Sequence, residues 1–317
     1  MQTYILRRFG MLVPVWLGIT LLVFVLSELS PGDPAAMILE QQLGQPPTIE
    51  QLQAQRERMG LNDPPVVRYA RWAADATRGD LGTSYRSGRP VVGVLVSRSW
   101  VTLQMAVPAF LVALAVSLLV GLVAAVKRNT VVDHASRVGS LTADSIPTYW
   151  LAYLLILLFA VKLGWFPVAG RGTWQHVVLP VVTLGIGTTA TMMRLTRSSL
   201  LEVLGEDYIR TARAVGVRDR RVIAHHALRN AMIPVVTVAG MILGHFVTGT
   251  VIVEYVFAWP GVGKYVVDAI FNRDLPVVQG FVLFAGAVFV FVNLLVDLSY
   301  AWLDPRVRFS GGTDGDR

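Results

Sequence analysis

Six long apolar stretches constrain this chain more than any other feature of its sequence. They are residues 9–29, 101–126, 138–161, 177–193, 231–253 and 277–301. A helix that crosses a lipid bilayer needs about 20 mostly apolar residues, and all the stretches reach or approach that length. Because a segment in lipid must satisfy its backbone hydrogen bonds internally, the sequence predicts an all-α membrane protein with six transmembrane helices. We expect residues 1–317 to form a single transmembrane domain.

The first stretch resembles a signal peptide in having a basic start, at Arg7 and Arg8, followed by an apolar core. That core is longer than the apolar region of a cleaved signal peptide. We therefore expect residues 9–29 to be kept as the first transmembrane helix.

The composition also favours a membrane protein. Apolar residues make up 54% of the chain and charged residues 15%, whereas about a quarter of the residues in soluble domains are charged. The basic residues behind the net charge of +7 lie beside the apolar stretches. This placement suits binding to an anionic lipid surface better than binding to nucleic acid. The chain has no cysteine, so disulfides, zinc–thiolate sites and cysteine nucleophiles are excluded.

Positive charges in the short loops predict the orientation of the chain. If it crosses the membrane six times, most of them fall on one side: Arg7, Arg8, Lys127, Arg128, Arg137, the arginines of residues 194–230, Arg306 and Arg308. The short loops on the other side carry only Lys162, Arg171, Lys264 and Arg273. Because positively charged loops stay in the cytoplasm, we expect both termini to be cytoplasmic.

The outer segment, residues 30–100, is too long for this charge rule to apply. Residues 49–60 predict an amphipathic helix that begins at the cap Thr48 and ends at Gly60. Residues 66–76 predict a second helix, which Tyr69 and Trp72 would hold at the membrane surface. Two interpretations are open: a lid over the helix bundle, or a docking surface for a partner outside the membrane.

The longest polar run between two apolar stretches in the second half of the chain is residues 194–230. It holds eight arginines, two histidines and four acidic residues, and it lacks proline. Its pattern predicts one helix over residues 200–215 and another over residues 219–229, with Gly216 supplying the left-handed turn between them. A helix–glycine–helix unit beside a membrane bundle offers a surface that another protein can bind.

The chain carries no recognisable catalytic or nucleotide-binding motif. The nearest match to a phosphate-binding loop ends at Gly263-Lys264, but Tyr265 stands where Ser or Thr must reach the metal ion. His225 and His226 are adjacent, so on a helix their side chains point about 100° apart. We therefore expect no catalytic, cofactor-binding or metal-binding residues here, and an energy source in another chain or an ion gradient.

Three ionisable residues fall within the apolar stretches, namely Asp144, His245 and Asp297. An ionisable residue in lipid is a functional hypothesis by default. One interpretation is coupling to protons or ions through the two aspartates. The other is an ion pair or a polar contact between helices, with His245 as a hydrogen-bonded packing residue.

The polar run also carries a resemblance to a known family. Residues 206–216 (EDYIRTARAVG) and 226–234 (HALRNAMIP) resemble the EAA loop of binding-protein-dependent ABC importers, in particular the first of the two sister permeases of dipeptide and oligopeptide importers. The similarity extends over nearly the whole chain. It includes residues 5–8 (ILRR), 30–34 (SPGDP), 79–84 (GDLGTS), 145–150 (SIPTYW) and 304–308 (DPRVR).

The resemblance implies a type I ABC importer permease in the bacterial cytoplasmic membrane, surrounded by lipid and without nucleic acid. Its implied partners are a homologous second permease, two ATPases that hold ATP and magnesium, and an extracytoplasmic binding protein that delivers peptides. Its implied ATPase contact consists of Glu206, Asp207, Tyr208, Arg210, Thr211, Ala212, Arg213 and Gly216. Arg210, Thr211 and Ala212 replace the Glu-Ala-Ala that names the loop, which leaves an ion pair of that glutamate in doubt.

Other functions stay open. Relatives within the family carry nickel or glutathione, and the binding protein largely sets their specificity. An ion-coupled secondary transporter is the alternative from another class, although this chain shows no clear internal repeat. A membrane-embedded enzyme is disfavoured because no catalytic constellation is present. The residues that line the pathway cannot be named from composition alone.

Overall fold

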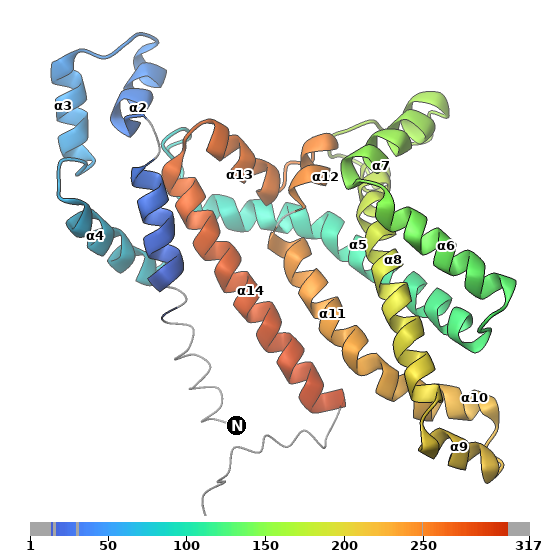
Figure 1. The fold of residues 1–317 in the computed structure, drawn as a ribbon. Coiled ribbons are helices and arrows are strands. Elements are labelled where there is room, and N and C mark those ends of the chain that lie inside the picture. The colour runs from blue at the N-terminus through green and yellow to red at the C-terminus, as the bar shows by residue number, and fades with distance from the viewer. Residues whose placement is uncertain (1–13, 15–16, 30–31, 249, 304–317) are drawn as a thin grey trace, which may run out of the picture. The chain divides into compact units, whose positions relative to one another are not determined.

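The structure, a computed structural model, describes residues 14, 17–29, 32–248 and 250–303. The described residues form helices and connecting loops without a strand, apart from one isolated bridge between Thr83 and Pro90. Figure 1 shows several long helices together with shorter ones at their ends. The prediction of an all-α fold is therefore confirmed.

Four described helices are long and apolar enough to cross a membrane. They are α5 (Val91–Val126), α8 (Gln175–Leu204), the continuous helix Asp219–Phe246, and the first part of α14 (Leu275–Leu303), residues Leu275–Val292. The first predicted span lies partly outside the described residues, and its described part is the helix Leu17–Glu28. The number of six crossings stays a prediction.

The predicted span 138–161 is not one straight helix. It consists of α6 (Val131–Ser145), α7 (Thr148–Leu155) and the π-helix η1 (Ile156–Lys162), with a bend of 100° between α6 and the rest. The bend follows from Pro147, because proline disfavours the helical conformation of the residue before it. Ile146 accordingly has an extended backbone, with φ −85° and ψ 121°. Counted as one broken span, this pair would be the fifth crossing.

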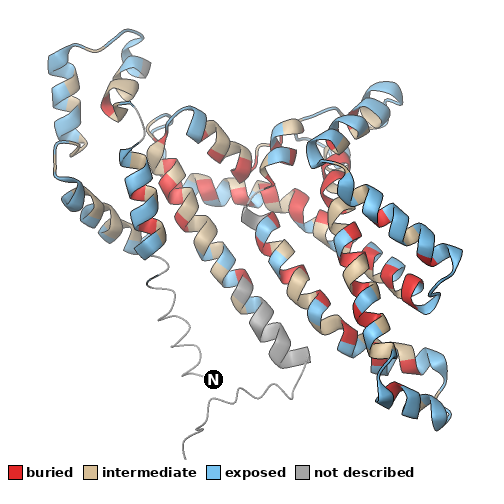
Figure 2. Cartoon of the chain, viewed as in Figure 1, coloured by how far each residue is buried: buried red, intermediate tan, exposed pale blue. Residues whose placement is uncertain are grey.

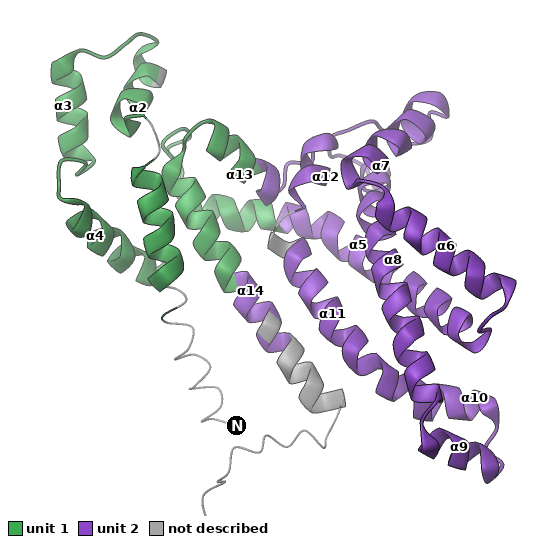
Figure 3. Cartoon of the chain, in the orientation of Figure 1, with its two compact units in different colours: residues 1–99, 265–287, 313–317 green, residues 100–264, 288–312 purple. Residues whose placement is uncertain are grey.

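The chain divides into two compact units, which are coloured separately in Figure 3. The first takes its described residues from 1–99 and 265–287, and the second from 100–264 and 288–312. α5 and α14 contribute residues to both units.

In the first unit, the outer segment forms α2 (Pro34–Leu43), α3 (Ile49–Arg58) and α4 (Pro65–Thr77). Both helices predicted in this segment are confirmed, and α3 begins with a capping box between Thr48 and Gln51. α4 packs on the helix Leu17–Glu28, where Tyr69 meets Phe24 edge-on at 5.4 Å between ring centroids. Arg68 pairs with Glu28 at 2.8 Å across the same contact.

The loop after α4 is fixed to the turn between α13 (Val262–Phe271) and α14. Asp274, which is 4% exposed, accepts hydrogen bonds from the Ser84 hydroxyl and from the Tyr85 backbone N–H at 2.9 Å. Burial of the Tyr85 side chain raises its pKa, so the phenol stays neutral beside this carboxylate. A buried carboxylate with several donors holds the loop in one conformation.

In the second unit, α8 packs against α6, α7 and α11 (Leu228–Thr248). At one end of α8, an apolar core includes Met105, Phe257 and Trp259. Beside it the buried Glu254, on α12 (Val251–Val256), accepts a hydrogen bond from Thr102 at 2.6 Å. A second apolar core lies at the other end of α8, where the polar run of residues 194–230 folds.

Candidate functional site

The polar run folds around a short helix, α9 (Asp207–Ala214), which lies between two long ones. The prediction of one helix over residues 200–215 is wrong. α8 continues to Leu204, and the chain breaks at Gly205 and Glu206 before α9 begins. Glycine weakens a helix, and Glu206 takes the extended backbone of an N-cap residue, with φ −67° and ψ 147°. Because of this break, the axis of α9 need not continue that of α8.

Gly216 forms the predicted left-handed turn, with φ +87°. The N–H of Gly216 donates to the carbonyl of Arg213 at 3.0 Å, and the N–H of Val217 donates to the carbonyl of Ala212 at 3.1 Å. These bonds satisfy carbonyls that the end of α9 leaves without helical partners. The turn is therefore a regular helix ending that requires a residue tolerant of positive φ.

The second predicted helix, over residues 219–229, does not end where expected. α10 (Asp219–Arg221), the π-helix η2 (Val222–Ala227) and α11 form one continuous helix from Asp219. No glycine or proline interrupts residues 219–233, so nothing ends the helix at the polar–apolar boundary. The loop is consequently joined directly to a helix of membrane-spanning length.

One face of α9 is buried. Ile209 is 0% exposed and packs into a core with residues from four other segments: Ala125, Leu200, Val222, Ala227 and Ala231. Sequence reasoning missed Ile209, although its place among polar residues on a short helix is the pattern of an amphipathic helix. This core fixes α9 to the ends of α5, α8, η2 and α11.

The other residues predicted to contact an ATPase are arranged around this buried side chain. Ala212 is half-buried, and the rest are exposed: Glu206, Asp207, Tyr208, Arg210, Thr211, Arg213 and Gly216. In Figure 2, most of α9 and of the turn that follows it is coloured as exposed. Residues 206–221 carry five arginines and three acidic residues, so this surface is positively charged on balance.

Polar contacts within the loop are local and exposed. Arg213 pairs with Asp219 at 3.0 Å, and Asn230 donates to the Tyr208 hydroxyl at 2.8 Å. Exposed ion pairs contribute at most about 1 kcal/mol, so these contacts arrange the surface more than they stabilise it. In the described part of the chain, no three His, Cys, Asp or Glu side chains gather in a way that could hold a metal ion.

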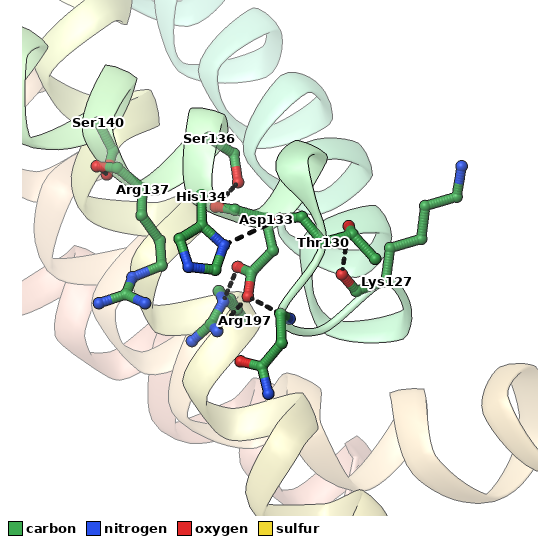
Figure 4. A network of polar contacts seen from close by, with 9 residues as sticks. Lys127, Thr130, Asp133, His134, Ser136, Arg137, Ser140 and Arg197 are labelled. Carbon is green, nitrogen blue, oxygen red and sulfur yellow. Dashed lines mark hydrogen bonds and ion pairs between the residues drawn. The ribbon is translucent and has the colours of Figure 1, made fainter.

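Two ion pairs join α6 to α8 near the loop. Arg194 pairs with Asp144 at 2.8 Å, which gives Asp144 the partner that the ion-pair interpretation requires. Arg197 pairs with Asp133 at 2.6 Å and is shown in Figure 4. His245 is exposed on α11, and the side chain of Asp297 lies outside the described ones.

Comparisons with known proteins agree with this arrangement. Residues 117–309 match the family described as "Binding-protein-dependent transport system inner membrane component". The oligopeptide transport system permease protein AppB of Bacillus subtilis (strain 168) is 38% identical over 322 residues, which cover 98% of this chain and 100% of AppB. The dipeptide transport system permease protein DppB of Escherichia coli (strain K12) is 40% identical over 339 residues, which cover 97% and 99%.

A third relative is the glutathione transport system permease protein GsiC of Salmonella paratyphi A (strain ATCC 9150 / SARB42), 40% identical over 309 residues and covering 98% of this chain and 100% of GsiC. Among solved structures, the MetNI methionine ABC transporter in an inward-facing conformation gives a TM-score of 0.56 at 20% identity. That match covers 67% of this chain and 96% of the MetNI chain, and it supports the fold alone. The chain belongs to the family of binding-protein-dependent transport system inner membrane components, as a multi-pass permease subunit with the type I importer fold.

Proposed function

We propose that this chain forms part of the membrane pathway of an ATP-driven peptide importer. In this proposal, an extracytoplasmic binding protein delivers the peptide and ATPases in the cytoplasm supply the energy. The observation that carries the proposal is α9, a short helix with one face in a shared core and the other exposed. A rigid helix fixed to the ends of long helices can pass a displacement on to them, whereas a flexible loop would absorb it.

Peptides are the substrate class that the relatives support. AppB is named for oligopeptides and DppB for dipeptides, and each relative matches nearly the whole of this chain. GsiC is named for glutathione and is similar to the same degree, so glutathione stays the second candidate. None of these three relatives is named for nickel.

Surface and charge support the proposed partners. We place the exposed residues of α9 at the ATPase, where the arginines suit an acidic partner and the half-buried Ala212 allows a close approach. We place both termini and α9 in the cytoplasm, as the positively charged loops favour. In each helix of spanning length, 39% or less of the most apolar part is buried within this chain, which leaves surface for lipid and for a homologous second permease.

The alternative from another class, an ion-coupled secondary transporter, has less support. Such a carrier would need an ionisable residue that can change its charge within the membrane. Asp144 forms an ion pair with Arg194 at 2.8 Å, which is the structural role that the ion-pair interpretation gives it.

The proposal is tested by purifying the chain with its native partners and reconstituting the complex into vesicles. We expect uptake of a labelled dipeptide that requires the binding protein and ATP, and that survives when proton gradients are collapsed. Oxidised glutathione and Ni²⁺ serve as competing substrates in the same vesicles. Uptake that follows a proton gradient without ATP would contradict the proposal.

A further inference from the structure

The ion pair between Asp133 and Arg197 is buried. Asp133 is 0% exposed and the Arg197 side chain is 17% exposed. Arg197 donates from Nε to Oδ1 at 2.6 Å and from Nη2 to Oδ2 at 2.8 Å, and the Asn129 N–H donates to Oδ2 at 3.0 Å. Figure 4 shows the carboxylate between the arginine and the turn that precedes α6. A pair with this geometry holds its two helices in one register.

The position of the pair is as informative as its geometry. Arg197 lies about two turns before α8 ends at Leu204, next to the break that leads into α9. Asp133 lies in the first turn of α6. The pair therefore joins α6 to α8 close to the core that holds α9.

That core joins α9 to several long helices of this unit, but not to α6. Its buried residues come from α5, α8, α9, η2 and α11, and none of them belongs to α6. A displacement of α9 is passed to those elements through apolar packing. α6 is joined to α5 by the turn of residues 127–130 and packs along α8, where Asp133 and Arg197 form a buried polar link.

A second link holds the other end of α6. Arg194 reaches the Asp144 carboxylate at 2.8 Å, one residue before α6 ends at Ser145. Directly after this link the chain bends by 100° into α7. α6 is thus fastened to α8 near both of its ends, while the bend at Ile146 and Pro147 separates it from the second half of its own span.

We propose that Asp133 and Arg197 are positioning residues for transport, which make α6 move with α8 when an ATPase acts on α9. The inference rests on the proposed function, because it requires an ATPase bound to α9. Without the pair, α8 would move and α6 would follow incompletely. ATP hydrolysis would then continue while less peptide is carried for each ATP consumed.

The first test measures this ratio in reconstituted complexes. Removing one partner alone leaves a buried charge unpaired and endangers folding, so the main variant is the neutral pair Asp133→Asn with Arg197→Gln. We expect this variant to co-purify with the ATPases at the wild-type level, and to import about tenfold less dipeptide per ATP hydrolysed. Arg197→Lys keeps the charge but loses the two-pronged contact, so we expect an intermediate ratio.

The control is an exposed ion pair of the same chemistry. Arg71 pairs with Asp63 at 2.8 Å with side chains 55% and 41% exposed, and Asp63→Asn is expected to leave the ratio unchanged. An unchanged ratio in the assembled neutral pair would make Asp133 and Arg197 a structural contact only and would overturn the inference. If the wild-type complex itself shows no ATP-dependent uptake, the proposed function fails, which is a different result.

The second test needs no change to the ion pair, and so it checks the joint movement of α6 and α8 even if the variants fail to assemble. The chain has no cysteine, which allows spin labels at chosen positions. Labels at the exposed Val138 of α6 and Ser198 of α8 should keep their distance when ATP is added to the wild-type complex. Labels at Val138 and the exposed Tyr153 of α7 should change theirs. A change between Val138 and Ser198 would contradict the inference.

Discussion

In the loop that precedes the long helix Asp219–Phe246, the side chain of Ile209 is buried while those of Asp207 and Arg210 are exposed on the same short helix. Burial of Ile209 in the shared core sets the rotation of α9, and that rotation decides which side chains a partner can meet. At this scale the site therefore has two kinds of residue, those that orient α9 and those that it presents.

Ile209→Ala tests the orienting role. Truncating a fully buried isoleucine costs about 2 to 5 kcal/mol where the surroundings cannot collapse around the cavity. We expect weaker recovery of the ATPases in a pull-down, although Ile209 itself would not touch them. Val138→Ala, at an exposed position on α6 and away from α9, is the control.

Gly216 allows a test of charge at constant shape. Its φ of +87° suits glycine, and asparagine and aspartate tolerate this region better than other residues. No atom lies within 4 Å of an added Cβ, so the first side-chain atom of either residue has space. If the partner surface is acidic, Gly216→Asp should reduce ATPase recovery about tenfold or more, a loss of about 1.4 kcal/mol or more.

Gly216→Asn is the matched control, because it has the shape of aspartate without the charge. We expect it to keep most of the ATPase recovery. Equal loss in both variants would show that backbone strain, and not charge, decides the result.

At the scale of elements, Gly121 allows a close contact between α5 and α8. A Cβ at Gly121 would lie 2.8 Å from the Cβ of Thr196 and 3.0 Å from the Met193 carbonyl. Both obstacles are close to the backbone of α8, so the helices would have to separate.

We expect Gly121→Ala to lower the stability of the purified chain by about 1 to 3 kcal/mol, as overpacking does elsewhere. Gly187→Ala in α8 is the control, since no atom lies within 4 Å of its added Cβ and alanine favours a helix. Thermal unfolding in detergent measures both variants. Equal midpoints would show that α5 and α8 adjust to the added methyl group.

The elements also show what sequence can predict. Helices α5 and α8 were predictable because apolar length is a local property, and α3 because its cap at Thr48 is local as well. The limits of α9 and the bend after Ser145 depend on packing between helices, and this packing cannot be read from one segment. Asp133 and Arg197 are 64 residues apart, so their pairing required the structure.

For the whole molecule, the orientation proposed here can be tested by labelling single cysteines in the cysteine-free chain. Val215→Cys, at a position 73% exposed beside Gly216, should react with an impermeant thiol reagent only after the membrane is opened. Thr77→Cys, at an exposed position at the end of α4, should react in intact cells. Labelling of Val215→Cys in intact cells would place α9 on the outer side of the membrane and contradict the proposed contact with an ATPase.

The shared core around Ile209 also limits which residues could change if the permease were to work with a different ATPase. Four other segments constrain the inward side of α9, so mutations there would disturb several helices together. The outward side does not belong to this core. Residues there, such as Asp207, Tyr208 and Arg210, can therefore vary with the ATPase without disturbing the core. Grafting only these outward side chains from a related permease should retarget the subunit to a foreign ATPase, with its interior left intact.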